Sequence, residues 1–135
     1  LGVCNIASPT TGLEAKFSFR LTAAMALAGV DTSALASFSD DSCTNPALLS
    51  LRDRVSVQTD PGMSDTAAQV RIKPRAGETI CAEHDLVTPM SRPERETRVR
   101  NKAAALWGND VAERVWEAIG EPAKPAGHWL ATLSH

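Results

Sequence analysis

Residues 55–83 read VSVQTDPGMSDTAAQVRIKPRAGETICAE, and apolar and polar side chains alternate along three parts of this stretch. The alternating runs cover residues 55–58, 68–73 and 79–83, and proline and glycine lie in the two segments between them. A period of two is typical of a strand with one buried face, and Pro and Gly favour turns. The stretch therefore predicts an antiparallel meander of about three to four strands with one covered face.

The segments on either side of the meander have helical patterns. An alanine-rich run that stops at Gly29 and an Asn45-Pro46 start signal are typical of helix boundaries. We expect helices over about 13–28, 31–38, 45–52, 93–106 and 109–119. This order predicts an α+β fold, a two-layer sandwich with the helices on one face of the antiparallel sheet.

The chain has 135 residues, which suits one domain. We expect that domain to cover residues 1–120, beginning with the tail of a strand at residues 1–7. Residues 121–135 contain a linker with two prolines and a short stretch that predicts a tail helix. Because the chain starts at Leu1 and not at Met, we expect it to be a fragment of a longer protein.

Charge and composition argue against several classes of partner. The net charge is −2, so neither nucleic acid nor an anionic membrane surface is expected as a partner. The longest apolar run, Ala23–Val30, is far shorter than the roughly 20 residues of a membrane span, and no secretory signal is expected. Cys4, Cys43 and Cys81 lack the spacing of a metal site, so free thiols in a reducing cytoplasm are expected.

One phrase is far more specific than these bulk properties. Residues 9–19 read PTTGLEAKFSF, followed by DTSALASFSD at 31–40 and LRDRVSV at 51–57. The first phrase resembles the P-x-T-G-L-E-A-K-F-S stretch of the MmgE/PrpD (2-methylcitrate dehydratase) family, and the other two are similar to later stretches of that family. The resemblance runs over residues 1–120 and is most specific in the first 57 residues.

The resemblance implies a fold, a partner and an activity. In this family a large helical N-terminal domain precedes a smaller α+β domain, and the chain resembles the smaller domain, which closes over the site as a lid. Members such as 2-methylcitrate dehydratase, an enzyme of propionate catabolism, cis-aconitate decarboxylase and iminodisuccinate epimerase act on small polycarboxylates without a cofactor. The chain is thus expected to belong to a cytoplasmic, homodimeric lyase or isomerase and to be inactive without the N-terminal helical domain.

The resemblance also bears on residues. The family's acid–base residues lie mostly in the N-terminal domain or at its junction, so no catalytic residue and no metal ligand is expected here. Ser18-Phe19-Arg20-Leu21 corresponds to an S-F-Q-Y pattern of relatives such as the decarboxylase. Leu21 stands where those relatives have tyrosine, which leaves the reaction open and argues against decarboxylation.

Lys16, Arg20 and Ser18 are the candidate substrate-binding residues. Lys16 and Arg20 are four apart and would share one face of the predicted helix. Two cations can hold the carboxylates of a polycarboxylic acid, and arginine can do so bidentately. Ser18, like Thr22, could donate a hydrogen bond to a carboxylate. The competing interpretations are solvated surface charges for the cations and local backbone bonding for the hydroxyls.

Other polar and aromatic residues have structural interpretations. His84 beside Asp85 could be a general base, but a role in a turn is favoured because adjacent residues of an extended segment point to opposite faces. The cations of residues 92–102 are interrupted by Glu94 and Glu96, which indicates a solvated helix face or a seam with the missing domain. The tryptophans, Trp107, Trp116 and Trp129, suit either the core or an interface.

Two functions without catalysis remain as alternatives. The strand face and the tryptophans could form a homodimerisation module. Lys16 and Arg20 could instead bind a small anion in a free-standing domain.

Overall fold

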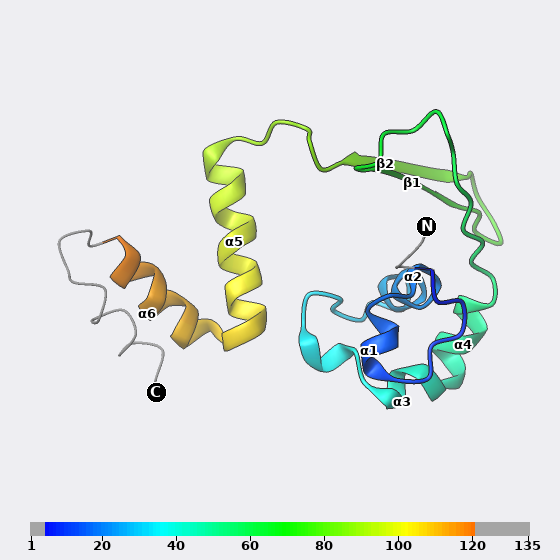
Figure 1. The fold of residues 1–135 in the computed structure, drawn as a ribbon, viewed down its shortest axis with the longest axis horizontal. Helices are drawn as coiled ribbons and strands as arrows, with labels where there is room; N and C mark the ends of the chain where they lie inside the picture. The colour runs from blue at the N-terminus through cyan, green and yellow to red at the C-terminus, as the bar shows by residue number, and fades with distance from the viewer. Residues whose placement is uncertain (1–4, 121–135) are drawn as a thin grey trace.

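A computed structural model of the chain describes residues 5–120. The fold is α+β, with helices at both ends of an antiparallel hairpin (Figure 1). It has three parts: an N-terminal helical cluster, the hairpin, and a pair of helices beside the cluster. Cys4, the start of the predicted first strand, the linker and tail helix at 121–135, and Trp129 lie outside the described residues.

The N-terminal helical cluster comprises short elements that follow one another closely. They are α1 (Gly12–Ala15), α2 (Phe19–Leu27), the 3₁₀ helix η1 (Leu35–Ser37), α3 (Asp40–Thr44) and α4 (Pro46–Arg52). α4 begins as predicted, because Oδ1 of Asn45 accepts hydrogen bonds from the backbone N–H groups of Ala47 and Leu48. α2 packs on α4, and α3 packs on α1 and α4.

The core of the described structure lies mainly inside this cluster. The buried side chains that form it are Ala15, Leu21, Met25, Cys43 and Leu48, with Val30 and Phe38 packed against them. Small helices can share such a core because each contributes only one or two apolar side chains.

The helix predicted over 13–28 is divided in two. α1 ends at Ala15, and α2 begins at Phe19 with Ser18 as its N-cap. The backbone N–H of Ile6 donates to the carbonyl of Phe17 at 3.0 Å, and Asn5 pairs with Ser18 as an isolated bridge. These contacts of the incoming chain accompany an extended backbone at Ser18, which interrupts the helix, although alanine content alone favours a continuous helix. Likewise, the helix predicted over 31–38 is only the short η1, and α3 was not predicted.

The predicted meander contains a two-stranded hairpin. β1 (Ala67–Ile72) and β2 (Ile80–Asp85) pair antiparallel, with Ala67 opposite Asp85 and Ile72 opposite Ile80. The run at 55–58 has no regular secondary structure and lies outside the sheet, so the third strand is wrong within the described residues. Its alternation has a different cause, since Val55 and Val57 are only half-buried beside the end of α4.

The expected helical layer does not cover the hairpin in the described structure. Val70 and Ile80, on its apolar face, are 51% and 57% exposed. Alternation predicts which face of a strand needs cover, but it cannot say which segment, or which chain, supplies that cover. The two-layer sandwich is therefore not formed by residues 5–120 alone.

The last two helices form a pair. α5 (Arg92–Trp107) begins at Ser91, whose Oγ accepts from the backbone N–H of Glu94, and α6 (Asn109–Ile119) follows after one residue. Gly108 makes the turn between them with φ 82°, and it replaces Asn109 or Asp110 as the residue before α6. Both helices match the predicted ranges closely. No helix in the described part of the chain is long and apolar enough to span a membrane.

Candidate functional site

The candidate site is the junction between α1 and α2, where the most specific phrase of the sequence lies. Thr11 caps α1, since its Oγ1 accepts from the backbone N–H of Glu14 at 3.2 Å. The Glu14 carboxylate in turn accepts from the N–H and the hydroxyl of Thr10, at 2.7 and 2.8 Å. These bonds lower the pKa of Glu14, with the backbone N–H of Thr10 as the largest cause. This arrangement is close to a capping box.

Gly12 fixes the junction to α3. Its backbone N–H donates to Oδ1 of Asp40 at 2.7 Å, and a Cβ on Gly12 would lie 2.3 Å from the carbonyl oxygen of Phe38. Cys43 adds a third link, because its Sγ lies 3.3 Å from the carbonyl oxygen of Thr11. Burial raises the pKa of the Cys43 thiol, so this cysteine stays protonated near neutral pH.

Ser18 is a structural residue in this geometry. It is 1% exposed, and its Oγ accepts from the backbone N–H of Leu21 at 3.2 Å, which caps α2. The Ser18 hydroxyl thus bonds to the local backbone, which was one of its two predicted roles. Leu21, three residues further along, is fully buried in the core.

Lys16 and Arg20 flank this cap. Lys16 is exposed just after α1, whereas Arg20 is half-buried in the first turn of α2. The prediction that they share one helical face is wrong, because the helix ends between them. They still lie within four residues of each other at one junction. Neither forms an ion pair within residues 5–120, and Nε of Arg20 is shielded from solvent without a hydrogen-bond partner there.

His84 and Asp85 do not form an acid–base pair. His84 lies on β2 opposite Ala68 and is exposed. The Asp85 carboxylate accepts from Oγ1 of Thr66 at 2.6 Å and from the N–H of Val87 at 3.1 Å. Both bonds lower the pKa of Asp85, the Thr66 hydroxyl most, and the carboxylate thereby closes the end of the hairpin.

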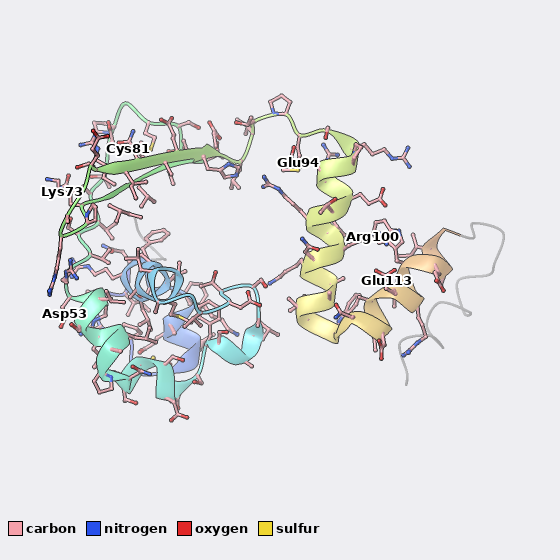
Figure 2. The ribbon with its side chains drawn as sticks, turned by 180° about the vertical axis from the view of Figure 1, so that it is seen from behind. Asp53, Lys73, Cys81, Glu94, Arg100 and Glu113 are labelled. Carbon is pink, nitrogen blue, oxygen red and sulfur yellow. The ribbon has the colours of Figure 1, made fainter. Side chains whose placement is uncertain are left out.

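Two of the α5 cations, Arg98 and Arg100, pair with nearby acids. Arg98 pairs with Glu94 at 3.0 Å, and Arg100 lies 3.4 Å from Glu96 and 3.3 Å from Glu113 of α6 (Figure 2). The guanidinium of Arg100 also lies over the ring of Trp116, 4.4 Å from its centroid. Trp116 therefore belongs to the helix pair, while Trp107 remains 50% exposed.

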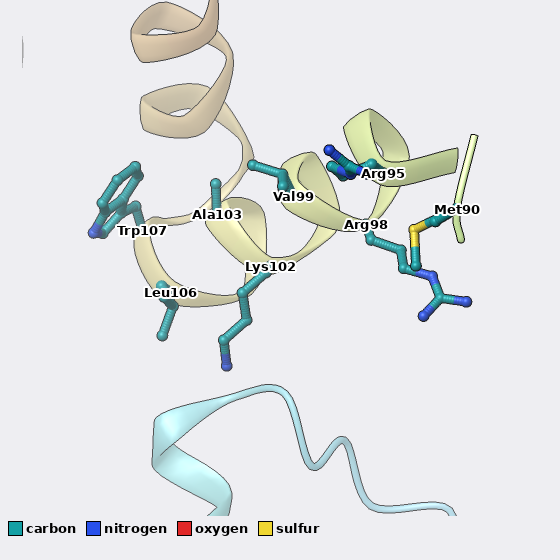
Figure 3. Close-up of a pocket in the computed structure, with 8 residues that line it drawn as sticks. All are labelled: Met90, Arg95, Arg98, Val99, Lys102, Ala103, Leu106 and Trp107. Atoms are coloured by element: carbon teal, nitrogen blue, oxygen red, sulfur yellow. The ribbon is translucent and has the colours of Figure 1, made fainter. Parts of the chain in front are cut away.

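Sequence reasoning missed a hollow of about 410 Å³ along α5 (Figure 3). Its lining combines apolar and basic side chains, namely Met90, Arg95, Arg98, Val99, Lys102, Ala103, Leu106 and Trp107. Val99, Ala103 and Leu106 have the helical spacing that places them on one side of α5, but the sequence does not show that this side stays uncovered. Nowhere in residues 5–120 do three or more His, Cys, Asp or Glu side chains gather as a metal site would need.

Comparisons of the chain with models of known families, with curated proteins and with solved structures found no match. The family resemblance of residues 9–57 thus stays a prediction.

Proposed function

We propose that this chain is the lid domain of a cofactor-independent lyase or isomerase that acts on small polycarboxylic acids, similar to 2-methylcitrate dehydratase. The proposal includes a preceding helical domain that supplies the acid–base residues, and a cytoplasmic homodimer. Its main support is the arrangement of residues 9–20, where a specific phrase resembles the MmgE/PrpD family and two cations flank a buried cap.

Three residues of this phrase hold the backbone from which Lys16 and Arg20 extend. Thr11, Gly12 and Ser18 are each held by a cap or a contact with α3, so the backbone on both sides of Lys16 is fixed. Arg20 starts from the first turn of α2, which is anchored by buried Leu21. A rigid backbone reduces the entropy lost when a side chain binds an anion.

The chemistry that such cations would serve is proton removal beside a carboxylate. That step builds further negative charge on a molecule that already carries two or three charges. An arginine or lysine on a neighbouring carboxylate lowers the free energy of this charge in the transition state. Lys16 and Arg20 have no competing carboxylate in an ion pair within the described structure, so their charges are available to a substrate.

Assembly would complete the fold. The apolar face of the hairpin, which includes Val70 and Ile80, is uncovered in residues 5–120. An isolated two-stranded hairpin is at best marginally stable in water. We infer that further strands and helices of the whole enzyme, or of its homodimer partner, complete the three- to four-stranded sandwich.

The test is the replacement of Arg20 by alanine in the enzyme that carries both domains. Loss of one charged hydrogen bond to substrate should lower kcat/KM for a polycarboxylate about 10–100-fold. A rise in KM with unchanged kcat would indicate uniform binding, and a fall in kcat would indicate a contact made in the transition state. The matched control is Lys73→Ala, an exposed cation beside the hairpin, which should change neither constant. If Arg20→Ala left kcat and KM unchanged, Arg20 would be a solvated surface charge and not a substrate ligand.

The uncovered hairpin face also supports an alternative, a homodimerisation module without catalysis. It requires that this chain alone forms a dimer in sedimentation experiments and that Val70→Asp makes it monomeric. A small-anion-binding module would instead bind citrate in calorimetry without any other domain.

A further inference from the structure

One face of α5 carries an apolar stripe. Val99, Ala103, Leu106 and Trp107 follow one another at helical spacing and line the hollow described above, with Met90 beside the N-terminal end of α5 (Figure 3). Val99 is 50%, Leu106 38% and Trp107 50% exposed. No other described element of the chain lines this hollow, so large apolar side chains face solvent there.

The charged side chains that line the hollow are all basic, and two acids lie just outside the lining: Glu94, paired with Arg98, and Asp31, near Lys102. Arg95, Arg98 and Lys102 line the hollow, and no acidic side chain does. The charge of Arg98 is partly neutralised by its ion pair with Glu94. Arg95 forms no ion pair within the described residues. Nζ of Lys102 donates to the carbonyl of Ser33 at 2.7 Å, which fixes its position without removing its charge.

These charges discriminate between possible occupants. A second copy docked face to face would bring three more cations against the same three, and like charges at an interface are unfavourable. An anionic partner would meet complementary charge at the same positions. The α5 residues that line the hollow run from residue 95 to residue 107, a length of about 18 Å, which matches a helix of about twelve residues.

We propose that this α5 face, lined by Met90, Arg95, Arg98, Val99, Lys102, Ala103, Leu106 and Trp107, is a docking site for an acidic amphipathic helix. The partner helix places leucine-like side chains into the hollow between Val99 and Trp107 and carboxylates beside Arg95 and Lys102. This inference goes beyond the proposed enzymatic role and does not depend on it, because it rests only on α5.

The probe is a pair of fluorescein-labelled 21-residue helical peptides with leucine along one face, flanked by Glu in one peptide and by Lys in the other. Fluorescence anisotropy with the full chain measures both affinities. We expect the Glu peptide to bind at least about tenfold more tightly, the scale of two or three exposed ion pairs. Raising NaCl from about 50 mM to about 500 mM should remove most of this preference, and that result needs no variant.

Variants locate the site. The triple change Arg95→Glu, Arg98→Glu and Lys102→Glu should reverse the preference toward the Lys peptide. The matched control changes three exposed cations of the hairpin region, Arg71→Glu, Lys73→Glu and Arg75→Glu, and should keep the preference for the Glu peptide. Val99→Asp should weaken binding of both peptides.

Three results would overturn the proposal. The first is equal affinity for both peptides or no binding of either. The second is a loss of preference in the hairpin control as large as in the α5 variant. The third is a dimer of the chain alone that Val99→Asp makes monomeric, which would assign the α5 face to a second copy.

Discussion

The backbone N–H of Gly12 donates a 2.7 Å hydrogen bond to Oδ1 of Asp40, and this bond ties the start of α1 to the start of α3. The two residues are far apart in the sequence, and each lies in one of the stretches on which the predicted family resemblance rests. The bond joins the phrase at 9–19 to the phrase at 31–40. The second phrase supplies the acceptor, Asp40, and the backbone of Phe38 against which Gly12 packs.

Gly12→Ala should destabilise the chain by about 1–3 kcal/mol, because the added Cβ would overlap the carbonyl oxygen of Phe38, a backbone atom that cannot rotate away. Urea unfolding followed by circular dichroism measures the change in the free energy of unfolding. Gly62→Ala is the control, since its nearest atom is the end of the Asp60 side chain at 3.3 Å, and it should stay within about 0.5 kcal/mol. Equal stability of the two variants would contradict the close packing at Gly12.

Asp40→Ala should lower stability by about 1–3 kcal/mol, since it leaves the part-buried N–H of Gly12 without its acceptor. Asp40→Asn keeps an oxygen at Oδ1 and should lose less than half as much. The same unfolding experiment ranks the three proteins. An asparagine variant as unstable as the alanine variant would show that charge, and not the acceptor, matters there.

Ser18→Ala should lower stability by about 1 kcal/mol through loss of the α2 cap. Thr22→Ala, one turn further along α2, is the control, because the Thr22 hydroxyl makes no hydrogen bond within the described structure. If Ser18→Ala instead kept full stability while substrate affinity of the enzyme fell, Ser18 would be a substrate ligand and its capping role would be minor.

Acid should weaken the N-terminal helical cluster in part through Glu14. Its pKa lies below the ordinary value of 4.5 in the folded chain, mainly because the Thr10 N–H binds the carboxylate. A group with a lowered folded pKa contributes stability above its unfolded pKa, and this contribution is lost as the pH falls through the folded pKa. Unfolding free energies at pH 7 and pH 3 should therefore differ less for Glu14→Gln than for the parent chain. An identical pH dependence in both would refute the role of Glu14.

Local signals in the sequence were sufficient to predict where several helices begin and where both strands lie. Asn45-Pro46 predicted the start of α4, and Ser91 with Pro93 stands at the start of α5, as the structure shows. The strands at β1 and β2 followed from strict alternation. In each case the cause lies within a few residues, so the sequence carries it directly.

Other features depend on contacts that a single sequence does not display. The break at residues 16–18 depends on Ile6 and Asn5, which pair with the chain at Phe17 and Ser18. The wrong third strand at 55–58 had a correct period but no partner within the described residues. Of the candidate site, the shared helical face predicted for Lys16 and Arg20 was wrong, because α1 ends before Lys16 and α2 begins at Phe19.

The central claim is that these residues form the lid of an enzyme for small polycarboxylates. Its most direct test expresses the complete reading frame that contains Leu1–His135 and follows turnover of 2-methylcitrate, cis-aconitate and iminodisuccinate, with the 135-residue chain alone as the comparison. The account predicts that the complete protein converts at least one of these compounds and that the chain alone converts none. A complete, folded protein that converts no polycarboxylate would contradict it.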